Sequence, residues 1–345
     1  FWAVGATILL ARLHVTPRMV ASRLANALFA LPLMSSKLDK TFSGPAISIP
    51  ATAPLLPTSP LGTAKLEVDQ LKLMSWNLLA TPYVRHPKEA REDGMARAKT
   101  QIAYAAQENA DVIGLQEFWS DSSELVGLWR EFAMSNGYLM HVCPRTDRKV
   151  DGCAMLIRAS ICSATPEFEA FSYSDWGNRV LQVCKLPVVG ASVPLTLYNT
   201  HLTFPHANEH DPVMRRHQAR KLSEIARVDD SATVVFGDLN IPNEDDDALK
   251  VLTTLGGLTP LPPTYVPVLG GEGERWYSHN AHTGELMACD QVLTRGRCKV
   301  QDWRLGLTHK GLVERSLPSD HRPMHASILV GEAATEEEEE EVSLS

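Results

Sequence analysis

The sequence predicts an α/β fold in which two packed β-sheets are covered by helices. Short apolar runs that end at polar or turn residues recur along the chain and are typical of strands. Longer amphipathic segments predict a smaller number of helices. Because several strands follow one another between helices, the order does not fit a simple alternation of strand and helix. Two sheets with helices outside them is the arrangement that buries the apolar faces.

The predicted elements follow from these patterns in chain order. The strand candidates are residues 71–77, 111–116, 137–142, 153–158, 180–186, 194–200, 232–237, 288–293 and 324–330. The helix candidates are residues 92–108, 121–134, 211–228 and a segment that begins near Asp245. Asp121 is a suitable N-cap for the second helix. For the third, Asp211 is the expected N-cap and Pro212 the first helical residue.

The flanks of the predicted domain differ from it in composition. Residues 1–40 are rich in Ala, Leu and Ser and contain one acid, Asp39, which is typical of an organellar targeting segment and equally of a disordered extension. Residues 41–64 are a Pro/Ser-rich linker, and residues 332–345 an acidic, disordered tail. The domain is therefore expected at residues 65–331. We expect an intracellular protein, in a plastid or mitochondrion if residues 1–40 are a transit segment.

Charge, cysteine content and hydropathy argue against a long nucleic-acid-binding surface, a disulfide framework and a membrane-spanning segment. The formal net charge is −8, but Glu332 and the Glu run 336–341 supply seven of the negative charges. The remaining chain has no strong basic footprint, so a long nucleic-acid track is not expected, whereas a single phosphate or a short strand fits. The six cysteines contain no C-x-x-C pair and predict reduced core residues. No run is long and apolar enough for a transmembrane segment.

Polar residues at the ends of five apolar runs are the strongest functional signal. Asn77, Glu117 and His201 each end such a run. The sequence Gly-Asp-Leu-Asn at 237–240 follows another, and Ser-Asp-His at 319–321 precedes the last strand. Carboxylates, amides and imidazoles collected at strand ends are what metal-assisted attack on a phosphate ester requires.

Each of these residue types suits one part of that chemistry. Glu117 suits the main Mg²⁺ ligand, with Mn²⁺ as the alternative ion, and Asn77 suits an outer ligand. Asp238 can align or deprotonate the attacking water, and the Asn240 amide can donate to a phosphoryl oxygen. The remaining candidates are the phosphoryl donor His321, its orienting partner Asp290, the second imidazole His201, and the phosphate-contacting pair Asn178 and Arg179.

The ordered motifs S-W-N, L-Q-E, N-T-H-L, G-D-L-N, C-D-Q-V and S-D-H-R-P resemble those of the endonuclease/exonuclease/phosphatase superfamily. The resemblance covers about residues 70–330. Within it, V-D-G-C-A-M at 150–155 and M-R-R-H-Q-A-R-K-L at 214–222 resemble the branch of carbon catabolite repressor deadenylases, nocturnin and angel.

The resemblance implies a four-layer α/β sandwich of two mixed sheets flanked by helices, and Mg²⁺-dependent hydrolysis of phosphoesters. By motif position it implies that Glu117 is the metal ligand with Asn77 beside it, that Asp320 and His321 form the S-D-H pair, and that His201 contacts phosphate.

The chain departs from that branch at two places. Trp76 stands where a Tyr is usual, and residues 203–211 are rich in His and Pro. We also expect no leucine-rich-repeat scaffold module ahead of the domain. Two substrate classes therefore stay open. One is RNA, cleaved by a deadenylase-like 3′-exonuclease. The other is a small molecule or lipid, hydrolysed by a nucleotide phosphatase of the nocturnin kind, a sphingomyelinase-like enzyme or an inositol phosphatase. A catalytically inactive binding module is disfavoured, because every expected catalytic side chain is present.

Overall fold

A computed structural model describes residues 70–84, 87–228, 232–242, 245–261 and 277–331, all within the compact unit Phe42–Ser345. The predicted targeting segment at 1–40, the linker at 41–64 and the acidic tail at 332–345 lie outside the described residues. The boundaries given to the domain therefore stay predictions. None of the described helices has the length and apolar character needed to cross a membrane.

Two six-stranded mixed sheets form the centre of the molecule, as the sequence predicts. The order of the first sheet is β13 (Cys298–Leu305), β14 (Met324–Val330), β1 (Leu71–Asn77), β2 (Val112–Phe118), β4 (Gly152–Arg158) and β3 (Tyr138–Pro144). The order of the second is β5 (Glu167–Ser172), β6 (Val180–Leu186), β7 (Leu195–His201), β8 (Ala232–Asp238), β12 (Asp290–Arg295) and β9 (Thr259–Pro260). A separate pair consists of β10 (His279–Asn280) and β11 (Leu286–Met287).

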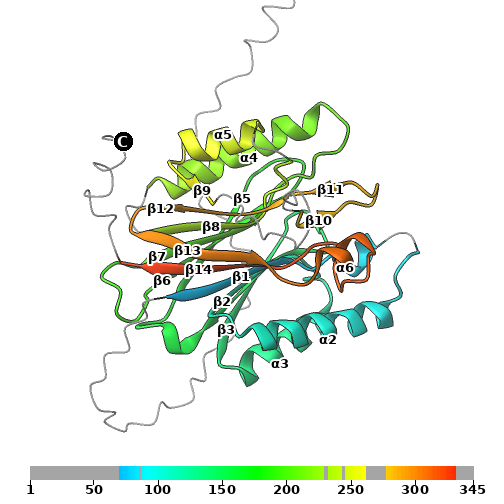
Figure 1. Cartoon of the computed structure of the whole chain (residues 1–345), viewed down its shortest axis with the longest axis horizontal. Helices are drawn as coiled ribbons and strands as arrows, with labels where there is room; N and C mark the ends of the chain where they lie inside the picture. Colours follow the sequence, from blue (N-terminus) through cyan, green and yellow to red (C-terminus); the bar gives the residue numbers. More distant parts are fainter. Residues whose placement is uncertain (1–69, 85–86, 229–231, 243–244, 262–276, 332–345) are drawn as a thin grey trace, which may run out of the picture. The chain divides into compact units, whose positions relative to one another are not determined.

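Helices cover the outer face of each sheet, which gives four layers (Figure 1). One outer layer contains α2 (Arg91–Glu108) and α3 (Ser123–Ser135), and the other contains α4 (His210–Ala226) and α5 (Asp247–Thr254). The short elements are η1 (Thr81–Tyr83), η2 (Ala159–Ile161) and α6 (His309–Val313). Because both faces of the central strands are buried, these strands are nearly continuous apolar runs rather than alternating ones.

The two sheets pack directly against each other. One apolar cluster joins Leu73 and Met155 of the first sheet to Leu197 and Phe236 of the second. Gly114 of β2 permits this contact, since a Cβ atom there would lie 2.1 Å from the Phe236 ring. The approach fixes the relative positions of the strand ends that carry the polar residues of the site.

Two helix starts differ from the sequence prediction. Ser122, not Asp121, caps α3, and its side chain accepts from the Leu125 amide at 3.3 Å. Helix α4 begins at His210, before the predicted cap Asp211. The Asp211 carboxylate instead accepts from the preceding loop, including the His206 amide at 3.1 Å, so local loop contacts compete with capping here.

Candidate active site

The strand order brings the polar residues predicted from the sequence to one end of both sheets. β1 and β2 are parallel, as are β7 and β8, so the carboxyl end of each pair lies at the same edge. In the second sheet, the registers place His201 and Asp290 on either side of Asp238. In the first, β14 runs antiparallel to β1, so the Ser319–His321 segment that precedes it lies beside Asn77. The Ser319 hydroxyl donates to the Asn77 carbonyl at 2.7 Å.

Asp238 is the point where these strands meet. Its Oδ2 accepts from the Asn77 amide Nδ2 at 2.8 Å, and Nε2 of His201 lies 3.3 Å from the same oxygen. Its Oδ1 accepts from the backbone amide of Asn240 at 3.1 Å. Burial raises the pKa of Asp238, and the positive charge of His321 offsets part of that rise. Asn77 thus holds Asp238 in this structure, and its part as a metal ligand stays a prediction.

Gly237 is required for this arrangement. It adopts φ of 138°, and a Cβ atom there would lie 2.0 Å from the Thr200 carbonyl oxygen of the neighbouring strand. Asn240 follows with φ of 51°, its Nδ2 donates to the Leu202 carbonyl at 3.0 Å, and its buried Oδ1 has no hydrogen-bond partner. The G-D-L-N motif therefore presents a free amide oxygen at the centre of the site.

His201 has a defined tautomer. The Arg179 guanidinium has only donors and lies 2.7 Å from His201 Nδ1, so this nitrogen accepts and the ring proton is on Nε2, facing Asp238. Burial, followed by the nearby charges of Arg179 and Arg145, holds the pKa of His201 well below its usual range. His201 is therefore neutral, and both of its ring nitrogens have partners within the protein.

His321 has the opposite protonation state. Its Nδ1 donates to Asp290 Oδ2 at 2.8 Å, and its Nε2 lies 3.6 Å from Asp238 Oδ2. Burial alone would lower the pKa of His321, but the charges of Asp290 and Asp238 outweigh it and raise the pKa to about 10. The ring is thus a buried imidazolium between two carboxylates. The sequence-based pairing of His321 with Asp290 describes the geometry seen here.

His279 is a residue of this site that the sequence analysis missed. Its ring stacks on that of His321, with centroids 4.0 Å apart and planes at 12°. Its Nε2 lies 3.5 Å from Asp320 Oδ2. Burial would raise the pKa of Asp320, but His279 and His321 lower it to about 2. His279 lies outside any apolar run, in the two-residue strand β10, so periodicity offers no signal for it.

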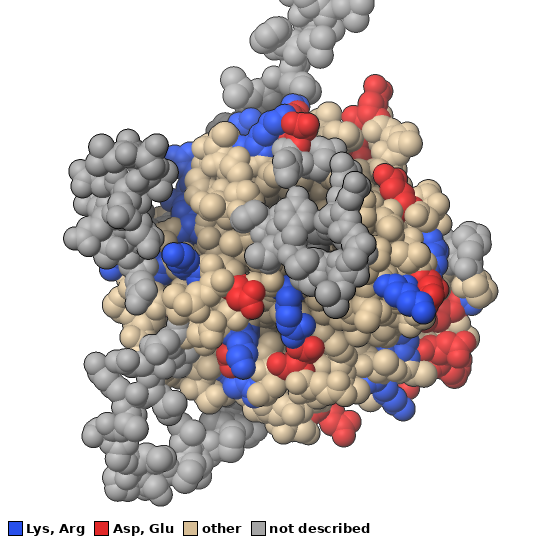
Figure 2. All heavy atoms as spheres, in the orientation of Figure 1, with Lys and Arg blue, Asp and Glu red and all other residues tan. Residues whose placement is uncertain are grey.

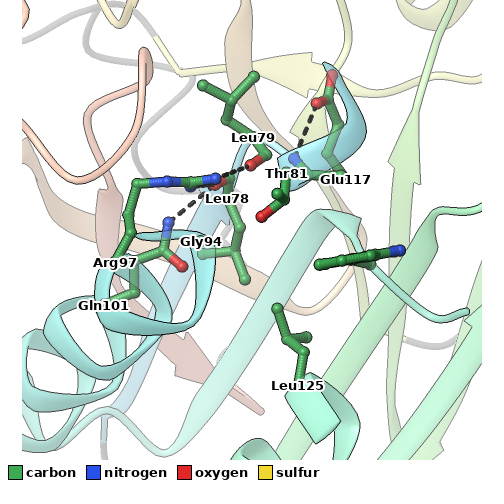
Figure 3. Close-up of a pocket in the computed structure, with 10 residues that line it drawn as sticks. Leu78, Leu79, Thr81, Gly94, Arg97, Gln101, Glu117 and Leu125 are labelled. Carbon is green, nitrogen blue, oxygen red and sulfur yellow. Dashed lines mark hydrogen bonds between the residues drawn. The ribbon is translucent and has the colours of Figure 1, made fainter. Parts of the chain in front are cut away.

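Glu117 lies at a break in the regular pairing of β2. The pairing of β2 with β4 becomes irregular between Leu115 and Phe118, and Glu117 has φ of 44°, which a non-glycine residue rarely adopts. Its Oε2 accepts from the Ala80 amide at 3.3 Å, beside a small pocket lined by η1 and α2 (Figure 3). Burial and the charges of Asp320 and Asp151 raise the pKa of Glu117 to about 7.

The Gly177-Asn178-Arg179 segment reaches the site through Arg179 only. Asn178 accepts from the Thr146 hydroxyl at 3.3 Å, and its amide lies 3.4 Å from Asp147, so it holds a neighbouring loop. Arg145 joins the two loops, since it donates to the Asn178 carbonyl at 3.4 Å and pairs with Asp151 at 2.9 Å. Asp151, from the V-D-G-C-A-M motif, is therefore a buried anchor for the Arg179 segment.

The donor set fits a hard divalent cation. Glu117 and Asp320 are both carboxylates, and the charge of Asp320 contributes to the raised pKa of Glu117. The Asn240 Oδ1 atom, which has no hydrogen-bond partner, is a neutral oxygen donor. Oxygen ligands of this kind suit Mg²⁺. Two groups of side chains, His279–Asp320–His321 and Asp238–Asp290–His321, also place their ligand atoms within 4.8 Å of one another.

The six cysteines do not take part in this chemistry. All six are described and free of disulfides, and five are buried, as the sequence predicts.

The charges on the face seen in Figure 2 are interspersed, with Lys and Arg beside Asp and Glu rather than in a basic stripe.

Comparison with known proteins finds a family match and a distant relative. Residues 74–321 match the model of the Endonuclease/Exonuclease/phosphatase family. A protein of Arabidopsis thaliana, described as an uncharacterized calcium-binding protein, is 24% identical over 242 residues, which are 63% of this chain and 49% of that relative. The chain thus spans about half the length of the curated relative it matches.

Solved structures share the fold at low identity. ANGEL2, described as a 2′,3′-cyclic phosphatase and bound to adenosine-2′,3′-vanadate, is 18% identical with a TM-score of 0.62, over 76% of this chain and 96% of that one. The human Nocturnin catalytic domain is 16% identical with a TM-score of 0.56, over 76% and 95%. A humanized TDP2 of D. rerio is 17% identical with a TM-score of 0.54, over 75% and 99%.

Proposed function

The chain belongs to the Endonuclease/Exonuclease/phosphatase family and is a phosphoester hydrolase, and we propose that it is a Mg²⁺-dependent RNA phosphodiesterase that acts from the 3′ end. The observation that carries the proposal is the arrangement around Asp238, where a carboxylate, a neutral imidazole, an imidazolium and an arginine converge. The motifs that resemble the deadenylase branch favour RNA as the substrate.

In the proposed reaction, Asp238 positions the attacking water and takes its proton. Asn77 and His201 fix Oδ2 of this carboxylate, and the Asn240 amide fixes Oδ1, so the base is oriented before substrate binds. Because both nitrogens of His201 have partners, we assign it to holding Asp238 rather than to direct contact with phosphate.

His321 and Arg179 supply positive charge for the phosphoryl oxygens. His321 keeps its proton at neutral pH, because Asp290 and Asp238 raise its pKa to about 10, and it can donate a charge-assisted hydrogen bond. Asp290 fixes its orientation through Nδ1. Arg179 lies across the site, against His201. The Asn240 amide completes the set as a neutral donor or oxygen ligand.

Glu117 and Asp320 are the residues that we propose to hold Mg²⁺, with Asn77 as an outer ligand and Mn²⁺ as an alternative ion. When bound, the ion would neutralise charge on the phosphate and its leaving group. Burial, together with repulsion from Asp320 and Asp151, disfavours the charged form of Glu117. A bound cation would stabilise that charged form.

A small substrate is the second candidate, favoured by the interspersed surface charge (Figure 2). A nucleotide or cyclic phosphate, a phospholipid or an inositol phosphate needs no basic track beyond Arg179 and His321. The same catalytic groups would serve, because hydrolysis of a phosphomonoester also requires charge neutralisation at phosphorus and an oriented water.

The decisive experiment incubates the full chain and Mg²⁺ with four substrates in parallel: 5′-labelled RNA ending in poly(A), NADPH, a phospholipid and an inositol phosphate. His321→Ala should reduce turnover by at least about 100-fold, in line with the loss of a group that stabilises developing charge. His217→Ala, at an exposed position of α4, is the matched control and should retain activity.

The products separate the candidates. A ladder that shortens from the 3′ end supports the RNA assignment, and phosphate release from NADPH with intact RNA moves the chain to the nucleotide phosphatases. Hydrolysis of only the phospholipid or the inositol phosphate refutes the RNA assignment. Retained activity in both His321→Ala and Glu117→Ala would refute the proposed site itself.

A further inference from the structure

Trp176 is unusual among the aromatic residues of the chain. Of the described Phe, Tyr and Trp residues it is the only exposed one, with 72% of its surface accessible. It lies in the connection between β5 and β6, at 173–179. A single exposed apolar side chain needs no functional explanation by itself. The segment that carries Trp176, however, accepts hydrogen bonds from other elements at Asp175, Gly177 and Asn178.

Hydrogen bonds from side chains hold the segment on both sides of Trp176. Before it, Gln218 of α4, which is fully buried, donates to Asp175 Oδ2 at 2.7 Å. After it, Arg145 donates to the carbonyls of Gly177 and Asn178. Arg145 is itself held by Asp151, which is 1% exposed. The exposed indole is thus presented by a preorganised segment, which lowers the entropy cost of binding a ligand there.

The position of Trp176 relates it to the active site. Arg179 follows three residues later, and its guanidinium contacts His201 at 2.7 Å. The Cα atoms of Trp176 and Arg179 are at most about 11 Å apart, so the indole and the guanidinium extend from nearby points of one segment. The ring of His210, the first residue of α4, has its centroid 5.5 Å from that of Trp176 and is also exposed. His210 belongs to the His-rich segment 203–211 that departs from the deadenylase pattern.

We propose that Trp176, with His210 beside it, forms a stacking site for a nucleobase of the substrate. This inference rests on the proposed function and specifies it, because it predicts that the phosphate is recognised as part of a nucleotide. Every base has a π-face, so an exposed indole binds bases with little sequence preference. The alternative occupant is a membrane surface, but membrane docking needs several exposed apolar groups together. Among the described residues, the exposed aliphatic residues on the elements that carry this pair are Pro212 and Val213 of α4.

The test measures binding separately from hydrolysis. The full chain is titrated into fluorescently labelled oligoadenylate in EDTA, and binding is measured by fluorescence anisotropy. The same titration is repeated with an oligonucleotide of equal length that has abasic residues. Trp176→Ala should weaken binding of oligoadenylate by about 10-fold or more, and Trp176→Phe should retain most of it, because base stacking contributes an effect of this size. Abasic binding should be equal in wild type and Trp176→Ala. Met134→Ala, at an exposed position of α3, is the control.

Each result decides one of the two proposals. Unchanged oligoadenylate affinity in Trp176→Ala, or equal affinity of the wild type for the normal and abasic strands, overturns the stacking site. Loss of binding to phospholipid vesicles in Trp176→Ala, with oligoadenylate affinity unchanged, overturns it in favour of membrane docking. If Trp176-dependent binding is seen but the wild type with Mg²⁺ does not hydrolyse RNA, the stacking site stands and the RNA phosphodiesterase assignment fails. RNA hydrolysis without Trp176-dependent binding supports the phosphodiesterase assignment and overturns the stacking site.

Discussion

At the residue scale, the two central imidazoles have different charges because their neighbours differ. His201 lies against the Arg179 guanidinium and is neutral, whereas His321 lies between two carboxylates and is protonated. Both are buried, so burial alone would have made both neutral. The neutral His201 holds the Asp238 carboxylate in place, and the protonated His321 is a cationic donor for a phosphate oxygen.

A third buried histidine, His325 of β14, predicts how stability depends on pH. Burial and the nearby charge of Arg304 lower its pKa to about 4, and its Nε2 is hydrogen-bonded to the Tyr104 hydroxyl at 3.0 Å. Between about pH 4 and 6.5 the unfolded chain binds a proton at this residue that the folded chain does not. The free energy of unfolding should therefore fall as pH decreases through this window, by up to about 1 kcal/mol per pH unit from this residue.

Urea denaturation at several pH values between 4 and 7 measures this effect. His325→Gln keeps a hydrogen-bonding side chain but does not titrate, so its stability should depend less steeply on pH than that of the wild type. His217→Gln, at an exposed position, should follow the wild type. Parallel curves for wild type and His325→Gln would show that His325 is not the linked group.

At the scale of elements, helix α2 is hydrogen-bonded to the loop that follows Asn77 and to the loop that carries His321. Gln101 donates to the carbonyls of Leu78 at 2.8 Å and Pro318 at 2.7 Å. Arg97 lies one turn earlier and donates to the Leu78 and Leu79 carbonyls, at 2.7 Å each (Figure 3). A helix outside the sheet thus sets the distance between two parts of the site.

Removal of this clamp should affect both stability and catalysis. Gln101→Leu leaves two buried carbonyls with fewer donors and should cost about 1–3 kcal/mol of unfolding free energy. Because Leu78 and Pro318 adjoin site residues, kcat should fall more than KM rises. Thr100→Ala, on the exposed side of the same helix, should change neither. A loss of stability with an unchanged kcat would mean that Gln101 supports the fold only.

Most elements could be predicted because central strands are buried on both faces. β1, β6 and β14 have the residue ranges expected from their apolar runs. β5 and β13 were missed, since each is an edge or near-edge strand with exposed polar residues and no apolar run. Helix starts were less predictable, because Asp121 and Ser122 are both suitable caps and only the local geometry selects Ser122.

The candidate site was predictable to the extent that its residues end strands. The parallel pairs β1–β2 and β7–β8 bring such endings together, so Asn77, Glu117, His201 and Asp238 could be recognised from position alone. His279 and Arg145 could not, because His279 lies in the two-residue strand β10 and Arg145 lies in the β3–β4 connection, and the placement of both depends on the folded sheets. Trp303 of β13 is buried at 7% exposure, whereas Trp176 is exposed, and no pattern in the sequence distinguishes the two residues.

At the scale of the whole molecule, the packing of two sheets concentrates negative charge where their ends meet. Asp238 and Asp290 come from the second sheet, and Glu117 and Asp320 from the first sheet and the segment before its strand β14. His321 and Arg179 offset part of this charge. Burial, followed by the charges of Asp320 and Asp151, raises the pKa of Glu117 to about 7. A divalent cation bound between Glu117 and Asp320 should therefore stabilise the folded molecule as a whole.

Thermal denaturation of the full chain with and without Mg²⁺ tests this coupling independently of activity. An ion that binds only the folded state stabilises it by about 1.4 kcal/mol at ten times its Kd, so the Tm should rise by a few degrees. EDTA should reverse the rise. Glu117→Gln should lose most of the rise, because a neutral amide replaces a charged ligand, whereas Glu131→Gln, at an exposed position of α3, should retain it. An equal rise in Glu117→Gln and wild type would place the stabilising ion elsewhere and remove Glu117 from the proposed metal site.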